Sequence, residues 1–457
     1  MRIINDLQRI IKKDISVWIK DSEIENRIDW IDLDSFKVFE NIQRVLESMD
    51  DYDNVILLGM GGSSLAPLVF CTIYQTQKRI FVLDTINPDQ ITYVENQIQG
   101  KRNVFIVSSK SGTTLETKVL QEYFEKKYPN SCFIAITDQG TVLDSQARQK
   151  GWIVFNPNPN IGGRYSAFTE FGLVPAYLAK VDIEPILYQL KDIKQNLLDF
   201  IDAKFPEFYA LQDIDRDFYY ILFEYDDVDY VIGLWLEQLI AESTGKNSKG
   251  VLPVIFNPSS YSMNIANVLG KFKLSLFKSE LAKWMYVWFM YTSLLCSYLK
   301  VNPFNQPDVQ LSKDITNKLI NSEDDIRIDD FYVVVDSIDD LYNVDLGAYL
   351  GDSTKSYDYV ALQVFSSYDY FDSFERLRYI IADRLKNVVV WGFGPRYLHS
   401  IGQLYKGGYG KPLFIQIIVE PKQKIENINR YFILQAMGDL ITTRNLGKQM
   451  VSIYVKA

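Results

Sequence analysis

Short runs rich in Val, Ile, Leu and Phe alternate with longer amphipathic stretches along the chain. Such runs are typical of strands buried on both faces, and their alternation with helices predicts parallel sheets covered by helices. The first series of expected strands comprises 54–58, 79–83, 103–107, 132–137 and 152–155. The second series comprises 218–223, 332–335, 359–364, 387–391, 412–419 and 451–455. The pattern therefore predicts an α/β fold.

The two series are separated by residues 169–204, which have a helical pattern without strand signals. A chain of 457 residues is also longer than one ordinary hydrophobic core requires. We therefore expect two doubly wound domains: 1–204, with an N-terminal helical segment and connecting helices, and 205–457. The apolar stretch 284–299 is too short to span a membrane and predicts a buried helix.

Charge and cysteine content narrow the class of protein. The formal net charge is -10, and no Lys- or Arg-rich stripe indicates a nucleic-acid partner. Cys71, Cys132 and Cys296 lie far apart among apolar neighbours, which favours inert thiols in a reducing compartment over disulfides or a zinc site. The N-terminus lacks the apolar core of a signal peptide, so we expect a cytoplasmic protein with no membrane partner. Because an acidic chain does not attract anions as a whole, a phosphate site must be built from local donors.

Two loops that follow expected strands carry such donors. Residues 58–64 read Leu-Gly-Met-Gly-Gly-Ser-Ser, where glycines let the backbone approach a ligand and Ser63 can donate a hydrogen bond. A dinucleotide-binding loop would have glycine in place of Ser64, yet Asp84 ends the next strand, where such folds bind a ribose. This loop alone therefore does not exclude a nicotinamide-dependent dehydrogenase or a turn that binds no ligand.

The second loop is richer in donors. Residues 108–114 hold five hydroxyl side chains around Gly112, at the start of an expected helix. Backbone amides and hydroxyls arranged in this way can surround a phosphomonoester without a metal ion. A capping turn needs one hydroxyl rather than five, so we favour phosphate binding over a simple cap.

Three further segments hold groups suited to catalysis. Arg164 follows two glycines in a constrained turn, from which a guanidinium can stabilise negative charge on a substrate oxygen. Gln238 and Glu242 stand four residues apart on one helix face, so both can reach one ligand. His399 is the single histidine of the chain, which excludes a multi-histidine metal site and leaves one imidazole for chemistry near neutral pH. Taken singly, each of these residues is also compatible with a structural role.

Together these segments resemble the phosphoglucose isomerase family. The resemblance rests on residues 59–63, 109–117, 162–166, 238–246 and 302–313. The order of 302–313, then 398–403, then 435–439 is similar to that in the isomerase half of transaldolase and phosphoglucose isomerase fusion proteins.

The resemblance implies two sugar-isomerase domains and a glycolytic and gluconeogenic enzyme without metal or cofactor, interconverting glucose 6-phosphate and fructose 6-phosphate. Glu242 would move a proton between carbons 1 and 2 through a cis-enediol, and Arg164 would stabilise the enediolate. His399 would assist ring opening with Lys313. In the family this histidine comes from the neighbouring subunit, so a homodimer is implied. The residues implied in substrate binding are Gly62, Ser63, Ser109, Lys110, Ser111, Thr114, Glu116, Gln238 and Gln306.

The chain departs from the family pattern in a few places. Asp308 and Ser312 stand where smaller or apolar residues are expected, and Tyr405 replaces an expected histidine. Lys448 competes with Lys313 as the active-site lysine. A dual phosphoglucose and phosphomannose isomerase stays open, as does a non-catalytic sugar-phosphate sensor. A sensor would be expected to lose the base, the arginine or the histidine, all of which are retained here.

Overall fold

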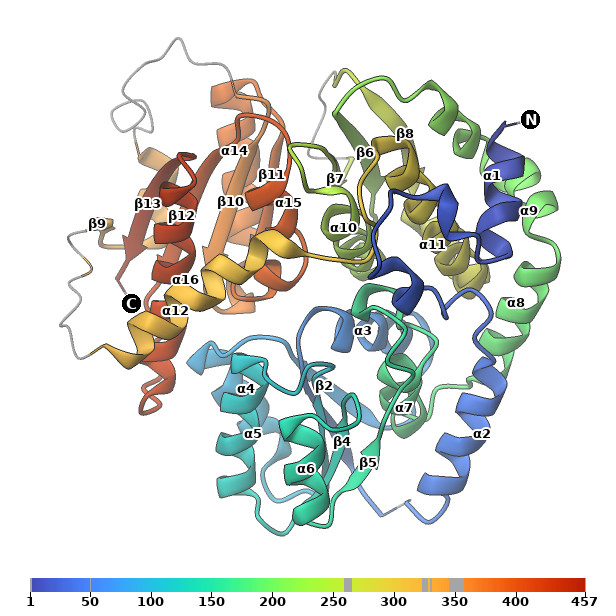
Figure 1. The fold of residues 1–457 in the computed structure, drawn as a ribbon. Coiled ribbons are helices and arrows are strands. Elements are labelled where there is room, and N and C mark those ends of the chain that lie inside the picture. The colour runs from blue at the N-terminus through green and yellow to red at the C-terminus, as the bar shows by residue number, and fades with distance from the viewer. Residues whose placement is uncertain are drawn as a thin grey trace.

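The computed structural model describes residues 2–49, 51–258, 265–322, 328, 331–344 and 357–456. Met1 and Ala457, at the ends of the predicted domain ranges, lie outside these residues. Within the described part, the strands form two five-stranded sheets and one three-stranded sheet (Figure 1). All strand pairs in these sheets are parallel, so the predicted α/β class is confirmed.

The first series of strands forms one five-stranded sheet in the order β2-β1-β3-β4-β5. Its strands are β1 (Asn54–Gly59), β2 (Arg79–Leu83), β3 (Asn103–Ser108), β4 (Cys132–Ile136) and β5 (Ile153–Phe155). Its helices are α3 (Leu65–Ile73), α4 (Pro88–Ile98), α5 (Leu115–Lys127), α6 (Val142–Gln149) and α7 (Glu170–Leu178). Val55 and Leu57 of β1 share a core with α3 and α7, whereas Ile56 and Leu58 share a core with α4 and α5. Helices therefore cover both faces, as the buried strand pattern predicts.

The second five-stranded sheet has the order β11-β10-β12-β13-β9. Its strands are β9 (Val333–Val335), β10 (Val360–Phe365), β11 (Val389–Phe393), β12 (Leu413–Val419) and β13 (Gln449–Val455). Its helices are α12 (Gln310–Asn321), α14 (Phe371–Leu385), α15 (Gly402–Gly407) and α16 (Ile428–Asn445). Helix α14 shares a core with one face of β10, and α15 and α16 with the other.

The two large sheets have the same strand order over four neighbouring strands. In the first sheet the remaining edge strand, β5, is the last of its series, whereas in the second sheet the edge strand, β9, is the first. This is the doubly wound order in which ligands bind beyond the carboxyl ends of the central strands. The relationship is structural, because no repeat is evident in the sequence.

A three-stranded sheet, ordered β7-β6-β8, lies beside the second large sheet, next to β11, and above the first large sheet in the view of Figure 1. It consists of β6 (Phe218–Glu224), β7 (Gly250–Phe256) and β8 (Val268–Lys273). The sequence predicts β6 among the strands of the second doubly wound domain, but β6 pairs with β7 and β8 instead. The pattern misses β7 and β8 because Pro253 interrupts the first and Lys271 and Lys273 interrupt the second. Proline is tolerated in β7 because that strand is at the edge of the sheet.

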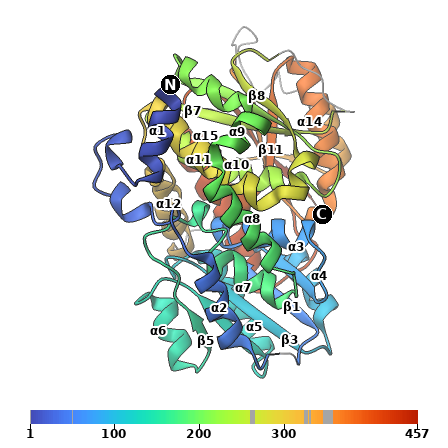
Figure 2. The same ribbon diagram turned by 90° about the vertical axis from the view of Figure 1, so that its right-hand side faces the viewer.

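The helices around this small sheet are largely buried. Helix α11 (Leu281–Leu299) contacts α1 (Arg2–Ile11), α8 (Glu184–Gln195) and α10 (Tyr230–Thr244), which confirms the predicted buried helix at 284–299. None of the described helices is long and apolar enough to cross a membrane. The N-terminal segment runs from α1, beside α11, to α2 (Ser35–Leu46), which packs on α7 (Figure 2). The domain boundary near Phe205 stays a prediction.

Candidate active site

Helix α10 packs against several elements of the molecule and carries Gln238 and Glu242, two of the predicted site residues. It contacts β7, α11, α3 and α15. The loops that follow β1, β3, β5 and β11 meet beside its C-terminal half, at the carboxyl ends of the parallel strands. They enclose the main cavity, which has a volume of about 320 Å³. The predicted site residues that line it are Gly62, Ser63, Lys110, Ser111, Thr114, Arg164, Gln238, Glu242, Gln306, Lys313 and His399.

Glu242 lies in the last turn of α10, and Gln238 one turn earlier on the same face. The Gln238 amide donates a hydrogen bond to Glu242 Oε2 at 3.1 Å and another to the backbone oxygen of His399 at 2.9 Å. Gln238 therefore fixes the carboxylate and the histidine loop relative to each other.

Arg164 is held beside this carboxylate. Its Nε lies 3.3 Å from Glu242 Oε2, and its side chain is 4% exposed. The guanidinium also donates to the backbone oxygen of Pro303 at 3.1 Å and to Gln306 Oε1. A buried, multiply bonded guanidinium is well placed to stabilise negative charge that forms next to the carboxylate.

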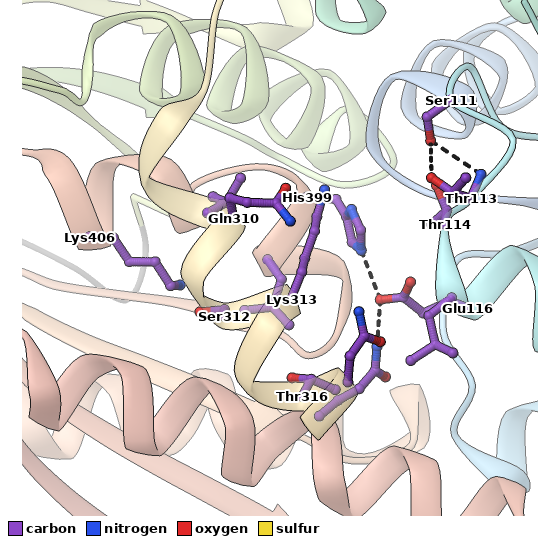
Figure 3. A pocket seen from close by; sticks show the side chains of 15 residues that line it. Ser111, Thr113, Thr114, Glu116, Gln310, Ser312, Lys313, Thr316, His399 and Lys406 are labelled. Atoms are coloured by element: carbon purple, nitrogen blue, oxygen red, sulfur yellow. Dashed lines mark hydrogen bonds and ion pairs between the residues drawn. The ribbon is translucent and has the colours of Figure 1, made fainter. Parts of the chain in front are cut away.

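His399 lies against a second acid. A side cavity of about 350 Å³ adjoins the main cavity, and Ser111, Thr114, Lys313 and His399 line both. His399 Nε2 is 2.8 Å from Glu116 Oε1, and the Gln435 amide donates to the same oxygen at 2.7 Å (Figure 3). Glu116 is buried, and it orients the imidazole at the junction of the two cavities.

The resemblance implies that a neighbouring subunit supplies the histidine. His399 instead reaches the main cavity of its own chain and pairs with Glu116 of that chain. The homodimer implied by the resemblance stays a prediction.

The hydroxyl-rich loop lies between β3 and α5. Ser111 Oγ and Thr113 Oγ1 are 3.0 Å apart, as are Ser109 Oγ and Thr114 Oγ1. Ser111 and Thr114 line the main cavity, whereas Ser109 is buried behind it. Lys110 also lines the cavity and is paired with Asp138 at 2.8 Å.

The two candidate lysines lie in different places. Lys313 is on α12 and lines both cavities. Lys448 follows α16 and is not among the described residues that line either cavity. Burial and the positive charge of Lys406 lower the pKa of Lys448. The geometry therefore favours Lys313.

The glycines of the first loop have a packing role. A Cβ atom on Gly62 would lie 2.3 Å from the backbone oxygen of Gly163, and one on Gly61 would lie 2.6 Å from that of His399. Gly61 also has a φ of +55°. Glycine is needed here because three loops of the site meet at van der Waals distance.

Asp84, the residue that kept a dinucleotide site open, is engaged within the protein. It is 2% exposed and accepts a hydrogen bond from the Tyr368 hydroxyl at 2.5 Å. Arg396 lies 3.7 Å from its other oxygen. These contacts join the loops that follow β2, β10 and β11 and bury the carboxylate, which argues against the dehydrogenase alternative.

Several residues of the two cavities were not identified in the sequence. Arg27 and Asp138 line the main cavity, and Lys406 and Gln435 line the side cavity. Arg27 comes from the N-terminal segment, which a bridge between Ile28 and Ile161 brings to the site, and no local motif marks it. Gln435 lies in the stretch 435–439 used for the family resemblance, so that stretch could have indicated it.

The unexpected Asp308 has a structural explanation. Its backbone amide donates to Gln403 Oε1 at 3.0 Å, and Gln403 Nε2 donates to its carboxylate at 2.5 Å. The same Nε2 donates to the backbone oxygen of Gly245 at 2.9 Å. Asp308 therefore ties the 302–313 segment to α15 and to the end of α10.

Comparisons with known proteins show which sequences this chain resembles. The family model described as phosphoglucose isomerase matches residues 45–249, which include Arg164, Gln238 and Glu242. The glucose-6-phosphate isomerase of Alkaliphilus metalliredigens is 32% identical over 275 residues, covering 52% of this chain and 60% of that protein. The enzyme of the same name from Methanocaldococcus jannaschii is 28% identical over 227 residues, covering 47% of this chain and 56% of that protein.

Residues 45–249 of the chain thus match the phosphoglucose isomerase family. The matches span between half and two thirds of the length of these relatives. A glucose-6-phosphate isomerase structure from Chlamydia trachomatis has a TM-score of 0.50 at 18% identity, covering 64% of this chain and 74% of that one. A hypothetical protein from Thermus thermophilus has a TM-score of 0.58 at 18% identity, covering 69% and 95%. These structures support the α/β fold of this chain.

Proposed function

We propose that this protein interconverts glucose 6-phosphate and fructose 6-phosphate. The observation that carries the proposal is the position of Glu242, which lies 3.3 Å from Arg164 in a cavity that His399 also lines. A carboxylate base, a cation beside it and an imidazole are the groups that aldose–ketose isomerisation by proton transfer needs.

The substrate enters with its phosphate at the hydroxyl-rich loop. Ser111 and Thr114 of that loop and Ser63 of the first loop line the main cavity and can donate to phosphate oxygens. The start of α5, directly after Thr114, adds the positive end of a helix dipole. Binding there directs the sugar carbons towards α10.

Proton transfer follows ring opening. His399, oriented by Glu116, donates a proton to the ring oxygen while the bond between that oxygen and carbon 1 breaks and the carbon 1 hydroxyl loses its proton to water, which leaves an aldehyde. Glu242 then removes the proton from carbon 2 and gives a cis-enediolate. The proton of the carbon 2 hydroxyl moves to the oxygen on carbon 1, and Glu242 delivers a proton to carbon 1 to form the ketose. Arg164 stabilises the negative charge on the enediolate oxygen, and Lys313 and Gln306 orient the sugar hydroxyls. No metal ion is required for any of these steps.

The cellular setting of the reaction is part of the proposal. The enzyme acts in the cytoplasm on a soluble hexose 6-phosphate. A homodimer stays a prediction of the family resemblance.

A coupled assay tests the activity. Purified protein is incubated with fructose 6-phosphate and a chelator, and glucose 6-phosphate is measured through a dehydrogenase that reduces a nicotinamide. Turnover that persists with the chelator is the expected result. Absence of turnover, with sugar phosphate still bound, would instead support a non-catalytic sensor.

Mannose 6-phosphate is measured in the same samples. Its appearance from fructose 6-phosphate would extend the function to a dual phosphoglucose and phosphomannose isomerase, because a base that reaches carbon 2 can serve both epimers.

A further inference from the structure

Lys246 is a buried cation for which the mechanism above has no role. It follows the C-terminus of α10 directly after Gly245, and the residue is 2% exposed. Its ammonium group donates to the backbone oxygens of Asn302 and Asn305, each at 2.6 Å, and to Asn305 Oδ1 at 3.1 Å. All three ammonium protons are therefore directed at the turn 302–306.

The same turn holds the arginine of the site. Arg164 donates to the backbone oxygen of Pro303 at 3.1 Å and to that of Asn305 at 3.4 Å. The turn ends at Gln306, whose Oε1 accepts a further hydrogen bond from Arg164. Lys246 and Arg164 thus share the Asn305 oxygen as an acceptor, and the lysine determines where the acceptors of the arginine lie.

We propose that Lys246 is a positioning residue for the isomerase reaction, which holds the 302–306 turn so that Arg164 and Gln306 face Glu242. The inference rests on the proposed function and adds a residue to it. Lys246 is not among the described residues that line the main cavity. It therefore acts through the turn and does not touch the sugar.

The electrostatics of the region fit this role. Burial and the neighbouring Arg164 lower the pKa of Lys246 to about 7, whereas Glu242 and Asp308 favour its charged form. Placing a second buried cation beside Arg164 costs free energy. Three hydrogen bonds to the turn, together with the negative end of the α10 dipole, offset that cost.

Steady-state kinetics of Lys246→Met test the proposal. Methionine has a similar length but cannot donate, so the turn is expected to shift and misplace Arg164. We expect kcat to fall by about a hundredfold, the order associated with small misplacements of catalytic groups. The KM and the Kd of a hexitol 6-phosphate, which has no carbonyl to react, should change by less than about threefold, because Ser63, Ser111 and Thr114, which would hold the phosphate, belong to other loops.

The matched control is Lys249→Met. Lys249 Nζ also donates to a backbone oxygen, that of Leu299 at 2.8 Å, but this carbonyl ends α11 and is not in the turn. This variant should keep wild-type kcat. A Lys246→Met variant with wild-type kcat would overturn the proposal. So would a parallel loss of kcat, hexitol phosphate binding and melting temperature, which would indicate a merely structural role.

A double-mutant cycle separates the two roles further. If Lys246 acts through Arg164, adding Lys246→Met to Arg164→Ala should lower kcat by less than about threefold. Full additivity of the two losses would contradict the proposal. If Lys246→Met does not fold, Asn305→Ala replaces it in the same cycle, with a smaller expected loss.

If the wild-type protein shows no turnover, the proposed function itself is refuted. If the wild type turns over and only the Lys246 variants give a contradicting result, the positioning role of Lys246 is refuted and the proposed function stands.

Discussion

His399 Nε2 lies 2.8 Å from Glu116 Oε1, and both side chains belong to the same chain. Burial acts to raise the pKa of Glu116, but the attraction of His399 and hydrogen bonds from His399 and Gln435 outweigh it and lower that pKa. Glu116 is therefore an anion at neutral pH, and its contact with Nε2 holds the imidazole in one orientation.

Glu116→Gln is expected to lower kcat by about a hundredfold, a typical loss when general acid catalysis is impaired. The amide keeps the size of the side chain but removes its charge, so KM should change little. The control is Glu122→Gln on the same helix, where the side chain is 63% exposed and pairs only weakly with Lys118 at 3.9 Å. Equal kcat values in the two variants would show that the Glu116 charge does not assist the reaction.

The choice between the two lysines can be tested directly. Because Lys313 lines both cavities, Lys313→Met is expected to lower kcat/KM by about a hundredfold, as for removal of one charged group from a site. Lys448→Met should stay within about threefold of wild type, because Lys448 is not among the described residues that line either cavity. The reverse ranking in the coupled assay would assign the active-site role to Lys448.

Glu237 predicts a pH dependence of stability. Burial raises its pKa from 4.5 to about 7, although Ser400 and Arg396 oppose this shift. Because the folded-state pKa is above the unfolded one, the folded protein binds more protons between these two values. Through this group the free energy of unfolding therefore falls as the pH rises from about 4.5 to about 7.

Glu237→Gln removes that titration and keeps an acceptor for the Ser400 hydroxyl, which lies 3.0 Å from Glu237 Oε1. Relative to wild type, the variant should become more stable by about 3 kcal/mol between pH 5 and pH 8. Urea unfolding at both pH values measures this. A stability difference that is the same at both would contradict the assignment.

The packing of the glycine loops makes a prediction about stability and activity together. Gly62→Ala places a Cβ 2.3 Å from the Gly163 oxygen, so the loop that presents Arg164 must move. We expect a loss of about 1 to 3 kcal/mol in unfolding free energy and at least a tenfold loss of kcat. Gly162→Ala is the control, because nothing lies within 4 Å of its Cβ and its φ is −64°. Similar melting temperatures for both variants would refute the packing role.

The sequence predicts the strands of the two large sheets well, because each is a continuous apolar run bounded by turns. It does not predict β7 and β8, where Pro253 and Lys271 interrupt the apolar pattern of an edge strand. Nor does it predict that β6 belongs to a third sheet, since pairing between strands distant in sequence leaves no local signal.

At the site, motifs identified most of the residues that line the main cavity, but not Arg27 and Asp138. Gln238 and Glu242 are recognisable from helical spacing, and 108–114 from its hydroxyls. Motifs do not reveal the roles of Arg27 and Lys246. The role of Arg27 depends on the tertiary contacts of the N-terminal segment, and that of Lys246 on the contacts of the 302–306 turn. The structure was likewise needed to show that His399 lines the main cavity of its own chain.

The most direct test of the account follows solvent deuterium into the sugar. Wild-type protein converts fructose 6-phosphate in D₂O, and nuclear magnetic resonance measures deuterium at carbon 2 of the glucose 6-phosphate formed. Proton transfer by Glu242 predicts deuterium at that carbon with the wild-type protein and none with Glu242→Gln, which should still bind a hexitol 6-phosphate. Exchange at the wild-type rate in Glu242→Gln would contradict the assignment of Glu242 as the base.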